Sequence, residues 1–193
     1  FTSVDDAFNS EAGLPAMNGM QMLAQAPAYD SNADIFTDAG VVITGIWNAN
    51  AAAEHFGENL GATDLPSFTV DGNSYHLGSY TGNKLMGVKP QTDAKRAVVL
   101  SMLAEYLTSE AAQIERYKAL NYGPSNVNAL ADETIASNLA LQALSAQSEF
   151  AISQMVLGGF WTPAEAFGAE LEAHSTADLQ TMLDQLVAQA LAG

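Results

Sequence analysis

The chain of 193 residues has 22 acidic and 6 basic residues, a net charge of −16, and 48% hydrophobic residues. This composition is typical of a globular protein, and the charge argues against nucleic acid or an anionic membrane surface as a partner. The absence of Cys excludes disulfides, thiolate metal sites and cysteine nucleophiles. No apolar run approaches the roughly 20 residues that cross a bilayer, and the polar, acidic start does not read as a signal peptide.

The basic residues are confined to one part of the chain. All 6 lie between residues 84 and 118, which gives this segment a net charge of +2 and leaves −18 for the remainder. Such a difference in charge indicates that the segment belongs to a different structural unit from its flanks.

The first predicted elements lie on either side of Trp47. A helix is expected at residues 13–23, followed by a cluster of turn-forming residues. The β-branched run Val41–Ile46, bounded by glycine, predicts a buried strand. Asn48 and Asn50 are capping residues in front of an alanine-rich segment, which predicts a helix to Phe56. Trp47 would then stand at the carboxyl end of a strand, where ligands bind in open α/β sheets.

Short extended segments are expected in the middle of the chain. Leu60–Pro66 reads as a strand closed by proline, and the Asp71-Gly72 pair predicts a tight turn. Residues 75–88 read as two short extended stretches with a flexible corner at residues 78–82.

The second half of the chain is predicted to be mainly helical. Apolar spacing places helices at residues 92–107, 109–120, 133–144, 163–173 and 177–192, the last capped by Ser175 or Thr176.

No catalytic motif stands out. The sequence has no nucleophile elbow, phosphate-binding loop or metal-spaced histidine cluster. His55, His76 and His174 lie far apart, so we interpret each as a surface or partly buried residue rather than a ligand. The acidic residues are scattered, although a facing pair such as a glycosidase needs is not excluded. The sequence therefore predicts a protein that is not an enzyme and needs neither cofactor nor metal.

The two tryptophans are the most informative candidate site residues. Trp161 follows two glycines and Phe160 and precedes a predicted helix, so it also lies at a loop-to-helix corner. Two such indoles could flank one cleft and stack on the apolar faces of sugar rings. Neutral polar side chains such as Asn48 and Tyr80 suit sugar hydroxyl groups. The alternative, that Trp47 and Trp161 are core residues, remains open on spacing alone.

Several segments occur in the order of a known family. Ile43–Trp47 looks like a strand-and-tryptophan motif, and Asn59–Phe68 is similar to a strand leaving a second lobe. Asn83–Val88 and the helices after it resemble the segment in which the chain passes back into the first lobe. Phe160-Trp161 resembles the second aromatic pair of the family. From about Ala7 to its end, the chain resembles the C-terminal half of the maltose/maltodextrin-binding proteins. These are family 1 extracellular solute-binding proteins of bacterial ABC importers.

The resemblance implies a helix-rich α/β fold of the periplasmic-binding-protein type II, with two lobes, of which this chain is the C-terminal half. Residues 1–76 and 126–193 would belong to the second lobe, and residues 77–125 would supply a hinge strand and a piece of the first lobe. Carried over by position, Trp47 and Trp161 would be the stacking pair. The expected ligand-binding residues are these two together with Asn48, Tyr80 and Phe160. Glu165 stands where the maltose binders have a basic residue, which leaves the exact sugar open.

The function implied is binding of a neutral, maltodextrin-like oligosaccharide and its delivery to the permease of an ABC transporter. The location would be extracellular, at the cell surface as a lipoprotein or in the periplasm. A fragment of a carbohydrate-active enzyme and a purely structural helical domain are the alternatives.

One further expectation concerns completeness. A strand and two helices of a first lobe cannot bury their own apolar faces, so Val98, Val99, Met102 and Leu103 should form an exposed patch. Either the N-terminal half of the same protein or a swapped copy would then cover it.

Overall fold

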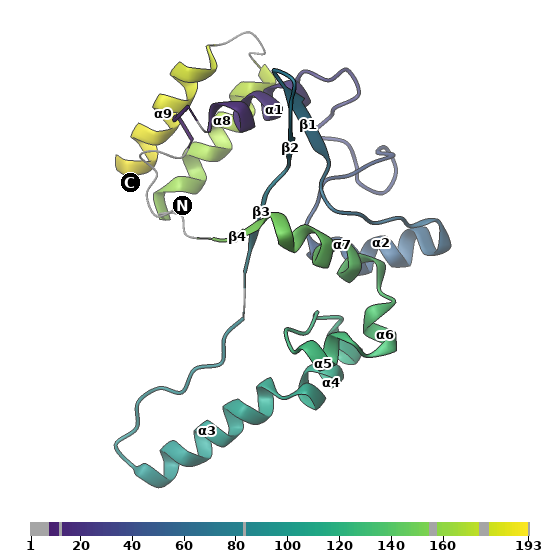
Figure 1. Ribbon diagram of the computed structural model, residues 1–193, viewed down its shortest axis with the longest axis vertical. Coiled ribbons are helices and arrows are strands. Elements are labelled where there is room, and N and C mark those ends of the chain that lie inside the picture. The colour runs from purple at the N-terminus through teal and green to yellow at the C-terminus, as the bar shows by residue number, and fades with distance from the viewer. Residues whose placement is uncertain (1–7, 12, 83, 155–157, 174–177, 193) are drawn as a thin grey trace. The chain divides into compact units, whose positions relative to one another are not determined.

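The computed structural model describes residues 8–11, 13–82, 84–154, 158–173 and 178–192 (Figure 1). The chain forms two compact units. Unit 1 comprises Phe1–Gly40, Leu65–Thr81 and Phe150–Gly193, and unit 2 comprises Val41–Asp64 and Gly82–Glu149. The predicted lobes concern a complete two-lobe protein, and their boundaries stay a prediction.

Three helices hold the core of unit 1. They are α1 (Leu14–Ala24), α8 (Trp161–Ala173) and α9 (Leu179–Ala192), and α8 and α9 run side by side (Figure 1). The buried core is made by Phe8, Phe160, Phe167, Leu171, Leu179, Met182, Leu183, Leu186, Val187 and Ala190. Four of the α9 residues, Leu179, Met182, Leu183 and Leu186, recur at helical spacing, which explains why this helix buries one complete face.

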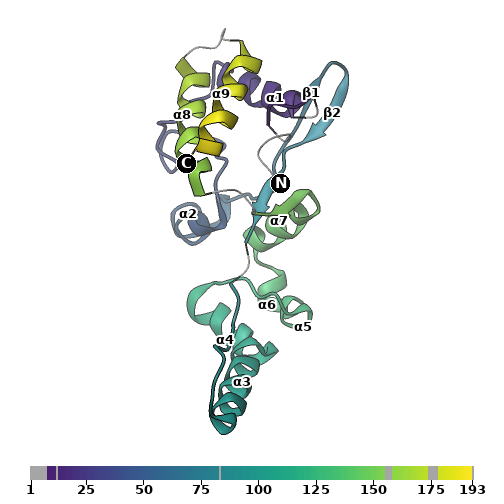
Figure 2. The same cartoon turned by 90° about the vertical axis from the view of Figure 1, so that its left-hand side faces the viewer.

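A hairpin packs against α1. Strands β1 (Ser67–Val70) and β2 (Asn73–His76) pair antiparallel (Figure 2). Both turn residues, Asp71 and Gly72, have positive φ, as the two-residue hairpin turns with the favoured twist require. The turn predicted from this Asp-Gly pair is confirmed.

A second pairing joins distant parts of the sequence. Strand β3 (Ser79–Thr81) pairs parallel with β4 (Ala151–Ser153), with Tyr80 opposite Ile152. The flexible corner expected at residues 78–82 is therefore wrong in its main part. A strand forms there because a partner from far along the chain satisfies its backbone, which local sequence cannot reveal.

Unit 2 is helical, and most of its helices have a side-chain cap. The short turns η1 (Ile46–Asn48) and η2 (Gly57–Asn59) lie on either side of the first helix, α2 (Ala49–Phe56). The helices that follow are α3 (Ala94–Thr108), α4 (Glu110–Leu120), α5 (Val127–Leu130), α6 (Glu133–Ala136) and α7 (Leu139–Gln147). Helices α3 to α7 begin after Asp93, Ser109, Asn126, Asp132 and Asn138, each of which accepts a backbone N–H from the first turn.

Two predicted strands are wrong. Val41–Ile46 forms no strand: its first residues are irregular, Ile46 begins η1, and the side chains of Val41, Ile43 and Ile46 are exposed. Leu60–Pro66 is irregular too, and β1 begins only after it. A β-branched run becomes a strand only when a neighbouring strand pairs with its backbone, and none of the described strands pairs with these segments.

Two helix predictions need correction in detail. The helix expected at residues 133–144 is divided into α6 and α7, because Asn138 caps a new helix there. The expected caps Ser175 and Thr176 lie outside the described residues. Asp178 instead accepts the backbone N–H of Thr181 through its carboxylate and that of Met182 through its carbonyl. The remaining helix predictions are confirmed within a few residues.

The apolar patch expected on α3 is confirmed. Val98, Val99, Met102 and Leu103 are all exposed, and Tyr106 extends the same face. None of the α3 residues is fully buried. A helix that is apolar on most of its circumference normally packs on more than one side. Within the residues that the structure describes, no helix is both long and apolar enough to span a membrane.

Candidate functional site

Three of the five predicted site residues meet in unit 1. Tyr80 and Trp161 pack edge to face with ring centroids 6.3 Å apart and an interplanar angle of 76°. Phe160 and Trp161 do the same at 5.3 Å and 71°. Perpendicular packing of this kind is a favoured arrangement, because the positive edge of one ring meets the negative face of another. The three rings therefore form one aromatic cluster.

Two local features place these rings. Tyr80 is the central residue of β3, and the pairing with β4 fixes its backbone. Trp161 is the first residue of α8, and Pro163 fits the first turn of this helix. Phe160 is only 6% exposed and stacks on Phe8 at 5.2 Å, which anchors the cluster in the core of unit 1.

The indole of Trp161 provides the accessible surface of the cluster. It is 49% exposed, whereas Phe160 is buried and Tyr80 is half-buried. Burial raises the pKa of the Tyr80 hydroxyl above its ordinary value, so this group stays protonated and can donate a hydrogen bond at neutral pH. An apolar ring face beside a neutral hydroxyl suits a ligand that combines apolar and hydroxyl surfaces.

The charged side chains of unit 1 include Asp and Glu but no Lys or Arg. All 6 Lys and Arg residues lie between positions 84 and 118, so none belongs to unit 1. The aromatic cluster thus lies in a unit that has no permanent cation to attract an anionic ligand.

The other two predicted residues lie in unit 2, in a short turn. Trp47 is 79% exposed and belongs to η1, rather than to the end of a buried strand. The backbone N–H of Asn48 donates to the carbonyl of Gly45 at 3.1 Å. The side-chain amide of Asn48 donates to the hydroxyl of Thr44 at 2.8 Å. Asn48 occupies the capping position of α2 without a side-chain cap, and its φ of −91° and ψ of −5° are helical rather than the extended conformation usual for a capping residue.

The sequence did not single out Thr44 and Gly45, which support the tryptophan. A methyl group at position 45 would overlap the Trp47 indole, so the ring lies directly against this glycine. A glycine two residues before an aromatic residue was the only available signal, and it is a weak one. Trp47 and Asn48 belong to unit 2, whereas Tyr80, Phe160 and Trp161 belong to unit 1.

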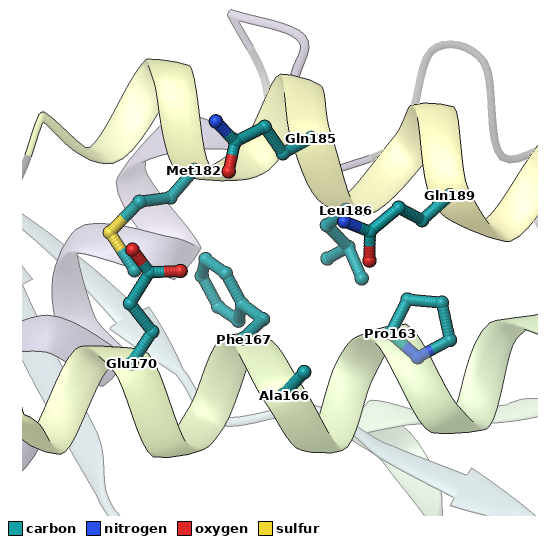
Figure 3. Close-up of a pocket in the computed structure, with 8 residues that line it drawn as sticks. All are labelled: Pro163, Ala166, Phe167, Glu170, Met182, Gln185, Leu186 and Gln189. Atoms are coloured by element: carbon teal, nitrogen blue, oxygen red, sulfur yellow. The ribbon is translucent and has the colours of Figure 1, made fainter.

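A hollow lies between α8 and α9 (Figure 3). Its floor is formed by Phe167, Met182 and Leu186, and Glu170 and Gln189 stand at its rim. Its space of about 50 Å³ compares with about 30 Å³ per water molecule and with several hundred Å³ for sites of small organic ligands. The hollow is therefore too small for an oligosaccharide.

Among the residues that the structure describes, no group of three or more His, Asp or Glu side chains could hold a metal ion. His174, one of the three histidines, lies outside the described residues.

Comparison with known proteins gives the family. The family model described as bacterial extracellular solute-binding protein matches residues 15–143, about two thirds of the chain. The match includes Trp47, Asn48 and Tyr80 and ends before Phe160 and Trp161. No curated protein matches the chain. The part of the resemblance that concerns the family is thus confirmed: the chain belongs to the bacterial extracellular solute-binding proteins.

Proposed function

We propose that this solute-binding protein binds a neutral, maltodextrin-like oligosaccharide and delivers it to the permease of an ABC transporter. The observation that carries the proposal is the half-exposed indole of Trp161, held edge to face by Tyr80 and Phe160. A rigid aromatic face suits the C–H surface of a pyranose ring, and it loses little conformational entropy on binding.

The charges favour a neutral sugar. An anionic ligand beside unit 1 would meet a field of carboxylates with no Lys or Arg to balance it. A neutral oligosaccharide avoids this repulsion and can use the Tyr80 hydroxyl as a hydrogen-bond donor. Its affinity should depend little on ionic strength.

Trp47 is proposed as the second stacking residue, with Asn48 beside it. Its indole is the most exposed aromatic ring among the large exposed side chains of unit 2. In a two-lobe binding protein, lobe closure would exclude water from the aromatic faces that contact the sugar.

The exposed face of α3 supports a further part of the proposal. We expect the N-terminal half of the same protein to cover Val98, Met102 and Tyr106, or a swapped copy to supply the same surface. These side chains are exposed although their apolar character favours burial.

The test is calorimetric titration of the full-length protein with maltose, maltotriose and longer maltodextrins. We expect binding of at least one of them, with an affinity that changes less than about threefold between 50 and 500 mM NaCl, because Debye screening affects only charged groups. Trp161→Ala should weaken binding by about 1–3 kcal/mol, the scale of one lost aromatic contact.

Two matched controls accompany this variant. Trp161→Phe retains an aromatic face and should bind more tightly than Trp161→Ala, and His174→Ala should bind as the parent does. Equal affinity of Trp161→Ala and the parent would exclude stacking on Trp161. Binding of a charged sugar, with no binding of a neutral one, would exclude the proposed ligand class.

A further inference from the structure

We propose that Gly45 and Thr44 are positioning residues, which hold the Trp47 indole in the orientation that meets the ligand. The inference rests on the proposed function, because it takes the exposed ring of Trp47 as a ligand contact. It adds two residues that make no such contact themselves.

The first support is the approach of the indole to Gly45. The ring atoms Cε3, Cζ3 and Cη2 of Trp47 occupy the space where a Cβ atom of residue 45 would lie. One edge of the ring thus lies against bare backbone. Any side chain at position 45 would force the indole to rotate away.

The second support is the backbone conformation of Gly45. Its φ of −93° and ψ of 166° lie in the extended region that every residue adopts without strain. Glycine is therefore not needed here for backbone freedom. The missing side chain is what the position requires, and the three atoms nearest to a Cβ at this position all belong to the Trp47 ring.

The third support is the hydrogen bond between Thr44 and Asn48. The Asn48 amide donates to the Thr44 hydroxyl at 2.8 Å, and the Asn48 backbone N–H donates to the Gly45 carbonyl at 3.1 Å. These two bonds close the turn on both sides of Trp47. The indole is 79% exposed, so core packing contributes little to its orientation and the turn must supply it.

The experiment follows the ring directly. The chain contains two tryptophans, so labelling with 5-fluorotryptophan gives two ¹⁹F resonances, which Trp47→Phe and Trp161→Phe assign. Gly45→Ala should shift the Trp47 resonance and leave the Trp161 resonance and the far-UV circular dichroism unchanged. Gly61→Ala is the matched control, because a Cβ atom there meets no atom within 4 Å, and it should shift neither resonance. An unchanged Trp47 resonance in Gly45→Ala overturns the proposal.

A second pair of variants tests the turn without touching Gly45. Thr44→Val keeps the size of the side chain and removes the hydroxyl that accepts from Asn48, so it should broaden or shift the Trp47 resonance. Thr44→Ser keeps the hydroxyl and should restore the spectrum of the parent. Identical Trp47 spectra in Thr44→Val and the parent would overturn the role of Thr44.

Binding then connects orientation to function. In titrations of the full-length protein with maltotriose, Gly45→Ala should weaken affinity about tenfold, whereas Gly61→Ala should have no effect. A shifted Trp47 resonance with unchanged affinity overturns the proposal, since the orientation of the ring would then have no effect on ligand binding. If the parent itself binds no oligosaccharide, the proposed function fails, while the fluorine spectra still decide whether Gly45 and Thr44 hold the ring.

Discussion

The side-chain carbonyl of Gln113 accepts the backbone N–H of Ser125 at 2.7 Å and joins α4 to the loop before α5. The same oxygen accepts the N–H of Asn126 at 3.1 Å, and the Gln113 amide donates to the Thr108 carbonyl at 2.6 Å. Gln113 is only 8% exposed, so one buried polar side chain satisfies three backbone groups of unit 2.

The first prediction concerns this side chain. Gln113→Ala should destabilise unit 2 by about 2–3 kcal/mol, because it leaves partly buried backbone groups without a partner. The measurement is urea unfolding followed by circular dichroism. Gln142→Ala is the control, since Gln142 is exposed and its bond to the Ala136 carbonyl lies at the surface; it should change stability by less than about 0.5 kcal/mol. Equal effects of the two variants would contradict the prediction.

The second prediction contrasts two glycines of unit 1. A Cβ atom at Gly19 would overlap the Phe68 ring, so Gly19→Ala should separate α1 from β1 and cost about 1–3 kcal/mol. A Cβ atom at Gly168 within α8 meets no atom within 4 Å, so Gly168→Ala should stabilise the helix by about 0.5–1 kcal/mol. Calorimetric unfolding of both variants gives the signs. If the melting temperatures of both variants changed in the same direction, the close packing of α1 on β1 would be incorrect.

The third prediction is a pH dependence at the start of α9. Hydrogen bonds from the Thr181 hydroxyl and backbone N–H lower the pKa of the Asp178 carboxyl below its ordinary value of 3.8. Because the pKa is lower in the folded protein, the stabilisation is present above the unfolded pKa and disappears as pH falls through the folded one.

Asp178→Asn tests this dependence, because asparagine also caps helices and does not titrate. The difference in melting temperature between the parent and Asp178→Asn should be constant above pH 5. Below about pH 4 the melting temperature of the parent should fall relative to that of Asp178→Asn. A difference that stays the same from pH 7 to pH 2.5 would contradict the assignment of the cap.

The fourth prediction concerns salt. Unit 1 contains Asp and Glu but no Lys or Arg, so its carboxylates repel one another without internal compensation. Raising NaCl shortens the Debye length from about 10 Å at 0.1 M to about 3 Å at 1 M and screens this repulsion. The melting temperature should therefore rise over this range. A melting temperature that is flat or falls with NaCl would show that repulsion within unit 1 is unimportant.

How far the sequence predicts the fold depends on the range of the interactions. The helices and the Asp71-Gly72 turn follow from caps, apolar spacing and turn residues that lie next to one another in the chain. The missed strand β3 depends on β4, whose residues come about seventy positions later. Val41–Ile46 has the composition of a strand, yet no described strand pairs with it, so composition alone misleads.

In the candidate site, too, the sequence predicts what depends on local features and misses what depends on contacts between side chains. Residue type and corner position selected Trp161, neutral polarity selected Tyr80, and the family resemblance added Phe160; the structure brings their rings together. The backing of Phe160 by Phe8 and the contact of Trp47 with Gly45 depend on ring orientations, which no local pattern encodes. The sugar-binding role of these residues stays a prediction.

The division of unit 1 into three stretches of chain has a consequence for the order of folding. Phe8 and α1 share a core with Phe167 and Leu183, which lie much later in the sequence, on α8 and α9. Unit 1 therefore cannot complete its core until α8 and α9 have been made, whereas the consecutive helices α3 to α7 of unit 2 can form earlier. During this interval the apolar side chains of α1 and the hairpin lack their partners on α8 and α9, and transiently exposed apolar surface of this kind favours aggregation.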